Sequence, residues 1–374
     1  PRQLMALEST RPGLALLLST LKHAHRETCG DVDDLLVGLQ LTHSGRFCRP
    51  NDWGRPEPRI LYHHPILDWR VGVNPAEDAA ILTDAEIGSI IEAFVRAARV
   101  AAEAGFDFVD IKHCHGYLGH EFLSAHTRPG QYGGSFENRT RFLRNIVDRV
   151  NKECGRDFLL ASRVNLFDGL PLPYGFGVNE QAVWGITPPP WPEGYSCRDA
   201  RYPVPDGKEP EMLVKMLVDH GVSILNATMG NPYFNPNVNR PFDRGSYTPV
   251  ENPLMGVERM IQGAAAVKKA FPELIVAGTG YSWLREFAAG VGDACIEDGK
   301  VDVMGLGRGA FAYPDFASDI LSYGKMKREK CCITCGKCTE IMRAGGSTGC
   351  MIHDREVYLP IYQNTVKAKD VSKP

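Results

Sequence analysis

The residues that most directly indicate chemistry are cysteines near the end of the sequence. The 374-residue chain contains 11 cysteines, and five of them fall within residues 331–350. Three are separated by two residues each, and a fourth follows after eleven more: Cys332, Cys335, Cys338 and Cys350. Four thiolates at this spacing can surround one inorganic centre, so the sequence predicts a metal site here.

Two kinds of centre fit four cysteines. A structural zinc site is one, because zinc accepts four thiolates at similar spacings. Zinc ribbons usually pair two separated Cys-x-x-Cys hooks, whereas here three cysteines follow one another closely, which favours a 4Fe-4S cluster. We expect Cys331 to point away from the centre. The other six are expected to be small buried apolar residues: Cys29, Cys48, Cys114, Cys154, Cys197 and Cys295.

The composition limits the class of protein. With 43% hydrophobic and 23% charged residues, the chain can bury one large core plus a small appendage. A net charge of −3 gives no basic field for nucleic acid, and no run of about 18 apolar residues predicts a membrane helix. Many cysteines without an export signal indicate a reducing compartment, and we expect a cytoplasmic protein.

Six short apolar runs rich in β-branched residues predict strands. They lie at residues 35–41, 106–111, 158–164, 222–227, 274–277 and 301–305. Helical patterns fall between them, at residues 84–104, 141–150, 212–218, 257–270 and 284–291. Thr83 and Glu86 form a capping box ahead of the first of these helices. Alternating strands and helices predict a parallel α/β sheet, either open and doubly wound or closed into a barrel.

Two long connections follow predicted strands. Residues 167–206 are rich in proline and aromatic residues, and residues 230–253 follow the fourth strand. A long connection in a compact domain is usually a lid or a binding loop. Both lie at carboxyl ends of strands, where barrel enzymes build their sites.

Three ordered motifs carry a resemblance to a known family. They are residues 39–46 (LQLTHSGR), 110–118 (DIKHCHGYL) and 132–139 (YGGSFENR). Together they resemble the old yellow enzyme family of NADH:flavin oxidoreductases. The cysteine spacing narrows the resemblance to the iron–sulfur branch that contains 2,4-dienoyl-CoA reductase and trimethylamine dehydrogenase.

The resemblance implies an eight-stranded TIM (β/α)8 barrel that binds FMN at its C-terminal mouth. The six predicted strands would be the third to the eighth, so two units, roughly 60 to 100 residues, are expected ahead of Pro1. We expect residues 1–325 to form the barrel and residues 326–374 the cysteine-rich segment.

The resemblance also assigns roles to side chains near the substrate. Tyr117 matches the family's proton donor, and packing against the flavin edge is the alternative. His115 matches a donor to the substrate's carbonyl oxygen, where it would stabilise developing charge. Its partner position is usually histidine, asparagine or tyrosine and here is Lys112, which makes an acidic substrate more plausible; an ion pair or a flavin contact is the alternative.

Six further residues match positions that hold FMN. Gln40 matches the amide that pairs with the pyrimidine edge of the flavin, and Arg163 matches the cation beside flavin N1 and O2. Glycines at two strand ends and one arginine match the phosphate site: Gly278, Gly280, Gly307 and Arg308. Tight turns with a solvated arginine are the alternative.

In relatives the cluster passes electrons between FMN and an FAD/NAD(P)H reductase module. We expect such a module or subunit as partner, or direct reduction by NAD(P)H; homo-oligomerisation is left open. The leading hypothesis is reduction of an activated C=C bond in an enone, enoate or enoyl thioester. One alternative is an amine dehydrogenase with an aromatic bowl built from Trp184, Trp191, Tyr233 and Phe234. Another is a non-catalytic electron-transfer subunit.

Overall fold

A computed structural model describes residues 3–179, 205–243, 248–249 and 251–367. Six strands form one sheet in chain order: β1 Gly38–Leu41, β2 Phe108–His113, β3 Leu159–Phe167, β4 Ile224–Met229, β5 Ile275–Gly278 and β6 Val303–Met304. The pairs β1–β2, β2–β3, β3–β4 and β5–β6 are parallel. All six predicted strands are confirmed, and β2, β3 and β4 extend a few residues further toward their carboxyl ends.

Helices connect and follow the strands. They are α1 Arg11–Cys29, α2 Asp84–Glu103, α3 Leu118–Leu123, α4 Phe136–Cys154, α5 Lys208–Asp219, α6 Pro236–Asn239, α7 Pro253–Ala270, α8 Ala288–Glu297, α9 Gly309–Ala312, α10 Phe316–Tyr323, α11 Lys337–Arg343 and α12 Arg355–Tyr362. Short 3-10 helices include η2 Gly45–Phe47 and η5 Tyr281–Phe287. Thr83 and Glu86 do form the predicted capping box at the start of α2. The helix α1 was not predicted.

The chain divides into two compact units. One comprises Pro1–Asn235 with Ala270–Val276, and the other comprises Pro236–Lys269 with Ala277–Pro374. The predicted boundary at residues 325/326 falls inside the second unit, and that division stays a prediction. No helix within the described ranges is both long and apolar enough to cross a membrane.

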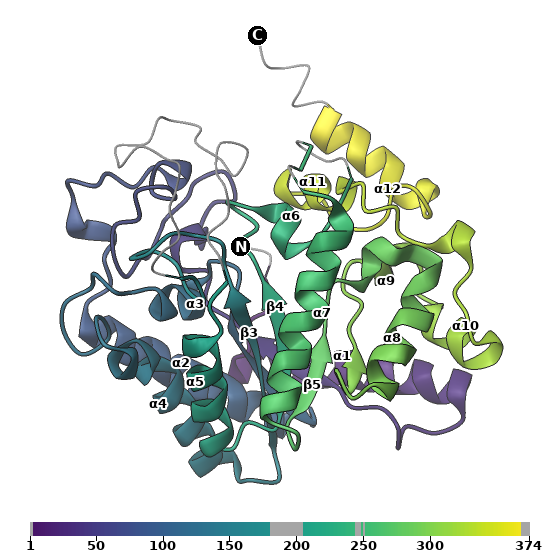
Figure 1. The fold of residues 1–374 in the computed structure, drawn as a ribbon, viewed down its shortest axis with the longest axis horizontal. Coiled ribbons are helices and arrows are strands. Elements are labelled where there is room, and N and C mark those ends of the chain that lie inside the picture. Colours follow the sequence, from purple (N-terminus) through teal and green to yellow (C-terminus); the bar gives the residue numbers. More distant parts are fainter. Residues whose placement is uncertain (1–2, 180–204, 244–247, 250, 368–374) are drawn as a thin grey trace. The chain divides into compact units, whose positions relative to one another are not determined.

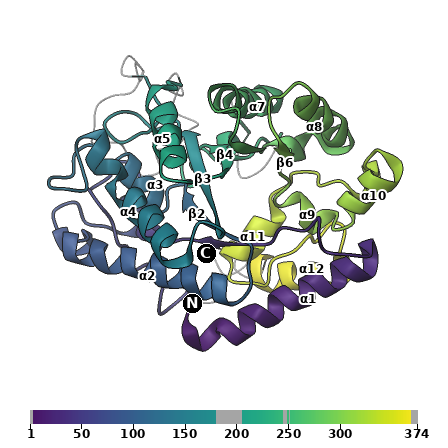
Figure 2. The ribbon, with the colours of Figure 1, turned by 90° about the horizontal axis from the view of Figure 1, so that it is seen from below.

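In the first unit, α2, α4 and α5 cover one face of the strands (Figure 1; Figure 2). Alternate residues of the strands point toward these helices, and Ile111, Val164 and Leu225 are fully buried there. This face and the helices form the apolar core of the unit.

The opposite face of the same strands is polar. Gln40 lies beside Asp110 in the register of β1 and β2, and Lys112 lies beside Arg163 in β2 and β3. Asn226 of β4 continues the second row. Because paired residues of parallel strands point to the same side of the sheet, these side chains share one face. The cofactor residues predicted on β1 and β3 therefore lie on the polar face of the sheet.

Candidate functional site

A sharp turn after β2 places Tyr117. His115 and Gly116 both have left-handed backbone conformations, with φ of 65° and 74°. A Cβ atom on Gly116 would lie 2.6 Å from Asn231 Nδ2, so only glycine fits. Leu118 N then donates to His43 O at 3.1 Å, which ties the start of α3 to the loop after β1. Tyr117 is thus fixed at the carboxyl end of β2.

Tyr117 lies between a cation and a second phenol. Lys112 Nζ is 3.8 Å from the centroid of the Tyr117 ring. Tyr233, in the loop after β4, donates its hydroxyl hydrogen to Tyr117 Oη at 3.1 Å, and the two rings meet edge to face. The structure therefore brings Lys112 and Tyr117 together and adds Tyr233, for which the sequence indicates only a place in an aromatic bowl.

Lys112 and Asp110, the charged groups of the polar face, are partly buried. Burial lowers the pKa of Lys112, and Arg163 acts in the same direction. Burial also raises the pKa of the Asp110 carboxyl, although Gln40 Nε2 donates to Asp110 Oδ2 at 2.6 Å and opposes that shift. A polar ligand on this face would meet groups whose charges water screens poorly.

The polar face has unpaired hydrogen-bonding atoms. In the described part of the chain, Arg163 Nε, Asp110 Oδ1 and Asn226 Oδ1 are buried without a hydrogen-bond partner. Such atoms are rare in proteins, and a bound polar group often explains them. The pyrimidine edge of a flavin carries alternating donors and acceptors, so these atoms and the Gln40 amide fit FMN chemically.

His115 lies nearby but is already engaged. It is 8% exposed, and its Nε2 is 3.1 Å from Thr228 Oγ1 on β4. Its role toward a substrate oxygen stays a prediction.

In the second unit, the four predicted cysteine ligands line a single pocket. Arg240, Arg308 and Lys337 line the same pocket. Arg240 Nη2 donates to Cys332 Sγ at 3.1 Å, and Thr334 N donates to the same sulfur at 3.4 Å. Both donors point at a sulfur that iron or zinc could bind.

Burial and neighbouring groups of like charge shift the pKa values of side chains in this pocket. Burial raises the pKa of the Cys335 thiol, and the three neighbouring cysteines act in the same direction. Burial and the charge of Arg240 lower the pKa of Arg308 to about 10. Cys331 is buried and donates to Lys327 O at 3.3 Å. Across the described ranges, no group of three or more His, Cys, Asp or Glu side chains is arranged to hold a metal ion.

The predicted phosphate residues lie in the same unit. Gly278 ends β5, and Gly280 has a φ of 102° that favours glycine. A Cβ atom on Gly307 would meet nothing within 4 Å. Arg308 donates through Nη1 to Thr339 Oγ1 at 2.5 Å and lines the cysteine pocket. Whether these four residues bind phosphate stays a prediction.

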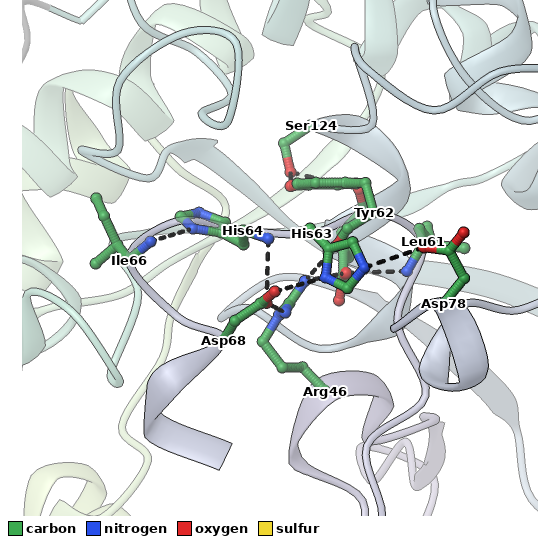
Figure 3. Close-up of polar contacts among 10 residues, drawn as sticks. Arg46, Leu61, Tyr62, His63, His64, Ile66, Asp68, Asp78 and Ser124 are labelled. Atoms are coloured by element: carbon green, nitrogen blue, oxygen red, sulfur yellow. Dashed lines mark hydrogen bonds and ion pairs between the residues drawn. The ribbon is translucent and has the colours of Figure 1, made fainter. Parts of the chain in front are cut away.

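A buried charge network was missed from the sequence (Figure 3). Arg46 is 1% exposed, forms ion pairs with Asp68 and Glu121, and donates to Tyr62 O at 2.9 Å. Burial alone would lower the pKa of Arg46, but the two carboxylates raise it. His63 Nδ1 adds a contact of 2.8 Å to Asp68 Oδ2. The partners lie 22 and 75 residues from Arg46, so no local pattern indicates them.

The network fixes the short helix η2 beside the candidate site. Phe47, which follows Arg46, stacks on Tyr233 with ring centroids 3.4 Å apart and planes 12° apart. Phe234 is 2% exposed and belongs to the core. Trp184 and Trp191 lie outside the described residues, as does Cys197.

The chain is similar in sequence to known proteins. Residues 31–172 match the NADH:flavin oxidoreductase / NADH oxidase family. The chain is 27% identical to an NADH oxidase of Thermoanaerobacter brockii over 90% of this chain and 44% of that protein. A shorter stretch, 39% of this chain, is 36% identical to 43% of an NADPH dehydrogenase of Geobacillus sp.. The chain thus spans less than half the length of these curated relatives.

Solved structures share the fold. A 2-naphthoyl-CoA reductase complex superposes with a TM-score of 0.65 at 20% identity, covering 93% of this chain and 46% of that one. Histamine dehydrogenase from Rhizobium sp. 4-9 superposes with a TM-score of 0.62 at 21% identity, covering 92% and 41%. At these identities the similarity establishes the architecture alone: the six strands are part of a (β/α) barrel fold.

Proposed function

We propose that the chain is the FMN-binding, iron–sulfur part of an enzyme of the NADH:flavin oxidoreductase / NADH oxidase family that reduces an activated C=C bond. The observation that carries this proposal is Tyr117, a phenol fixed at the carboxyl end of β2 with Lys112 against its ring and Tyr233 against its hydroxyl. This is the arrangement expected of a positioned proton donor.

Each side chain would have a separate role in the reaction. When bound, FMN supplies a hydride to one carbon of the double bond. Tyr117 gives its hydroxyl proton to the neighbouring carbon. Lys112 and His115 stabilise the negative charge that develops on the substrate's carbonyl or carboxylate oxygen. A cation at this position favours an enoate or an enoyl thioester over a neutral enone.

Residues of the polar face would hold the flavin ring. Gln40 pairs with the pyrimidine edge, and Arg163, whose Nε lacks a partner in the described part of the chain, places positive charge beside it. Gly278, Gly280, Gly307 and Arg308 would bind the phosphate.

The cysteine pocket would hold the 4Fe-4S cluster through Cys332, Cys335, Cys338 and Cys350. Support comes from their shared pocket and from Arg240 and Arg308, because cations offset the negative charge of a cluster with four thiolates. The cluster would pass electrons to or from an FAD/NAD(P)H module or subunit. Thiolate ligands of this kind persist in a reducing compartment such as the cytoplasm.

An amine dehydrogenase is the second candidate, favoured by the structural similarity to histamine dehydrogenase. Two observations count against it. Lys112 places positive charge where a cationic amine would bind, and Phe234 is buried in the core instead of forming a bowl. A non-catalytic electron-transfer subunit would have no need of the Tyr117 arrangement.

The test is anaerobic purification followed by flavin extraction, iron and sulfide assays, and turnover of four compounds. We expect FMN, about four irons per chain, and NAD(P)H-dependent reduction of cinnamate and cyclohexenone but no oxidation of trimethylamine or histamine. Zinc without iron would contradict the cluster, and amine oxidation without alkene reduction would favour the second candidate.

A further inference from the structure

Tyr233 stands on a loop that is tied firmly to the end of β3. Gly230 N donates to Phe167 O at 2.7 Å, and Asn165 Nδ2 donates to Gly230 O at 2.9 Å. Asn235 Nδ2 donates to Asp168 O at 2.8 Å from the other end of the loop. Buried side-chain amides bonded to backbone in this way leave a loop little freedom. The position of Tyr233 is therefore set by the protein before any ligand binds.

The ring of Tyr233 is held as firmly as its backbone. Tyr233 N donates to Asn231 Oδ1 at 2.9 Å, and its ring stacks on Phe47. Phe47 is the last residue of η2, whose Arg46 is anchored by the buried carboxylates of Asp68, labelled in Figure 3, and Glu121. Stacking and hydrogen bonding together point the Tyr233 hydroxyl at Tyr117.

The direction of that hydrogen bond matters for proton transfer. Tyr233 donates and Tyr117 accepts, so this hydrogen bond does not use the Tyr117 hydroxyl hydrogen. Once Tyr117 has lost its proton, the same hydrogen bond ends on an anion and becomes stronger. Lys112 against the Tyr117 ring adds favourable charge to the same anion.

We propose that Tyr233 is a positioning residue that acts through Tyr117, stabilising its phenolate and returning the proton. In the proposed reduction, bound FMN would supply a hydride, with its electron pair, to one carbon of the double bond. The π electron pair of the alkene then bonds the neighbouring carbon to the Tyr117 proton. Tyr117 remains as a phenolate, takes a proton from Tyr233, and Tyr233 recovers one from water. The proton-transfer part rests on the proposed function, whereas the effect on the Tyr117 pKa does not.

The direct test measures the acidity of Tyr117 in the holoenzyme. Tyr117 is replaced by 3-fluorotyrosine, and its fluorine resonance is followed against pH with and without Tyr233→Phe. Tyr233→Phe keeps the stacked ring and removes only the hydroxyl, so we expect the Tyr117 pKa to rise by about 1 to 2 pH units. The control is Tyr174→Phe, whose ring packs near Tyr62 and His64 and should leave the Tyr117 pKa unchanged.

A second variant covers a failure of Tyr233→Phe to fold. Phe47→Leu removes the stacking partner but keeps the hydroxyl, and should raise the Tyr117 pKa in the same direction by a smaller amount. The pH profile of alkene reduction should follow: its alkaline limb moves to higher pH in Tyr233→Phe, and the maximal rate falls about tenfold.

The outcomes separate the two claims. An unchanged Tyr117 pKa in Tyr233→Phe, or in Phe47→Leu if the first variant does not fold, overturns this inference even if the protein reduces alkenes. A raised pKa together with no alkene reduction by the unmodified protein supports the tyrosine pair and contradicts the proposed function.

Discussion

The Tyr117 site in the first unit and the cysteine pocket in the second are organised by different means. Around Tyr117, side chains hold one another: Arg46 fixes Phe47, Phe47 stacks on Tyr233, and Tyr233 bonds Tyr117. The cysteines instead lie on and beside short helices, α11 of 7 residues and α12 of 8, which are weak structures alone. The first site is organised by the protein, whereas we expect the second to become fixed only when the proposed cluster binds.

The largest expected effect concerns the cysteine pocket and its dependence on the proposed cluster. Cys335→Ser should abolish cluster assembly, since a hydroxyl is a poor iron ligand, and should leave residues 326–367 sensitive to protease. Iron and sulfide assays with limited proteolysis measure this. Cys154→Ser, on α4 and away from the pocket, is the control and should keep full iron content. Normal iron in Cys335→Ser would remove this residue from the ligand set.

The Tyr117 site depends on the buried ion pairs of Arg46. Breaking these ion pairs should therefore cause a large loss of stability. Arg46→Met leaves Asp68 and Glu121 buried without their cation and should lower the free energy of unfolding by about 3–5 kcal/mol. Arg149→Met removes an exposed pair with Glu92 and should cause a much smaller loss, because water screens that pair. Urea denaturation compares the two. Equal losses would mean that Arg46 does not organise the site.

The buried carboxyl of Asp168 adds a pH dependence to the first unit. Burial raises its pKa to about 8, although Leu170 N and Phe176 N donate to it. Between pH 4 and 8 the folded state keeps a proton that the unfolded state has lost, so stability falls as pH rises, then levels off.

Asp168→Asn should remove this contribution, a slope of up to about 1.4 kcal/mol per pH unit. The measurement is urea denaturation at several pH values, read as the difference between the variant and the unmodified protein. A difference that does not change with pH would show that Asp168 titrates normally.

The smallest expected effect concerns the tuning of the cluster. Reduction of the proposed cluster would add negative charge, which the Arg240 guanidinium bonded to Cys332 would stabilise. Arg240→Gln should therefore make the midpoint potential more negative by about 60 mV, a tenfold change in a one-electron equilibrium. Arg328→Gln, a 79% exposed side chain in the same unit, is the control. The midpoint potential is measured by a redox titration followed by electron paramagnetic resonance. Equal potentials in Arg240→Gln and the unmodified protein would show that Arg240 does not tune the cluster.

Much of the fold could be predicted because it depends on local patterns. Runs of β-branched residues marked all six strands, and Thr83 with Glu86 marked the start of α2. The helix α1 was missed because leucines at buried and exposed positions stand close together: Leu14 and Leu18 are buried, whereas Leu16 and Leu17 are exposed, so the helical period is hidden.

The site was predictable where motifs carried it and unpredictable where contacts are distant in sequence. The turn that carries Tyr117 lies within one motif, and the spacing of the four cysteines is local. Tyr233 lies 116 residues from Tyr117, and Arg240 lies 92 residues from Cys332. Contacts of this kind depend on how strands and loops pack, which a single sequence does not display.

One measurement tests the central claim most directly: the two half-reactions of Tyr117→Phe followed by rapid mixing under anaerobic conditions. The account predicts that re-oxidation of the reduced protein by an enoate or enone slows at least about 100-fold, because the proton donor is lost. Reduction by NAD(P)H, directly or through the proposed reductase module, should keep its rate. Equal slowing of both half-reactions, or no slowing of either, would contradict the role of Tyr117 and with it the proposed reaction.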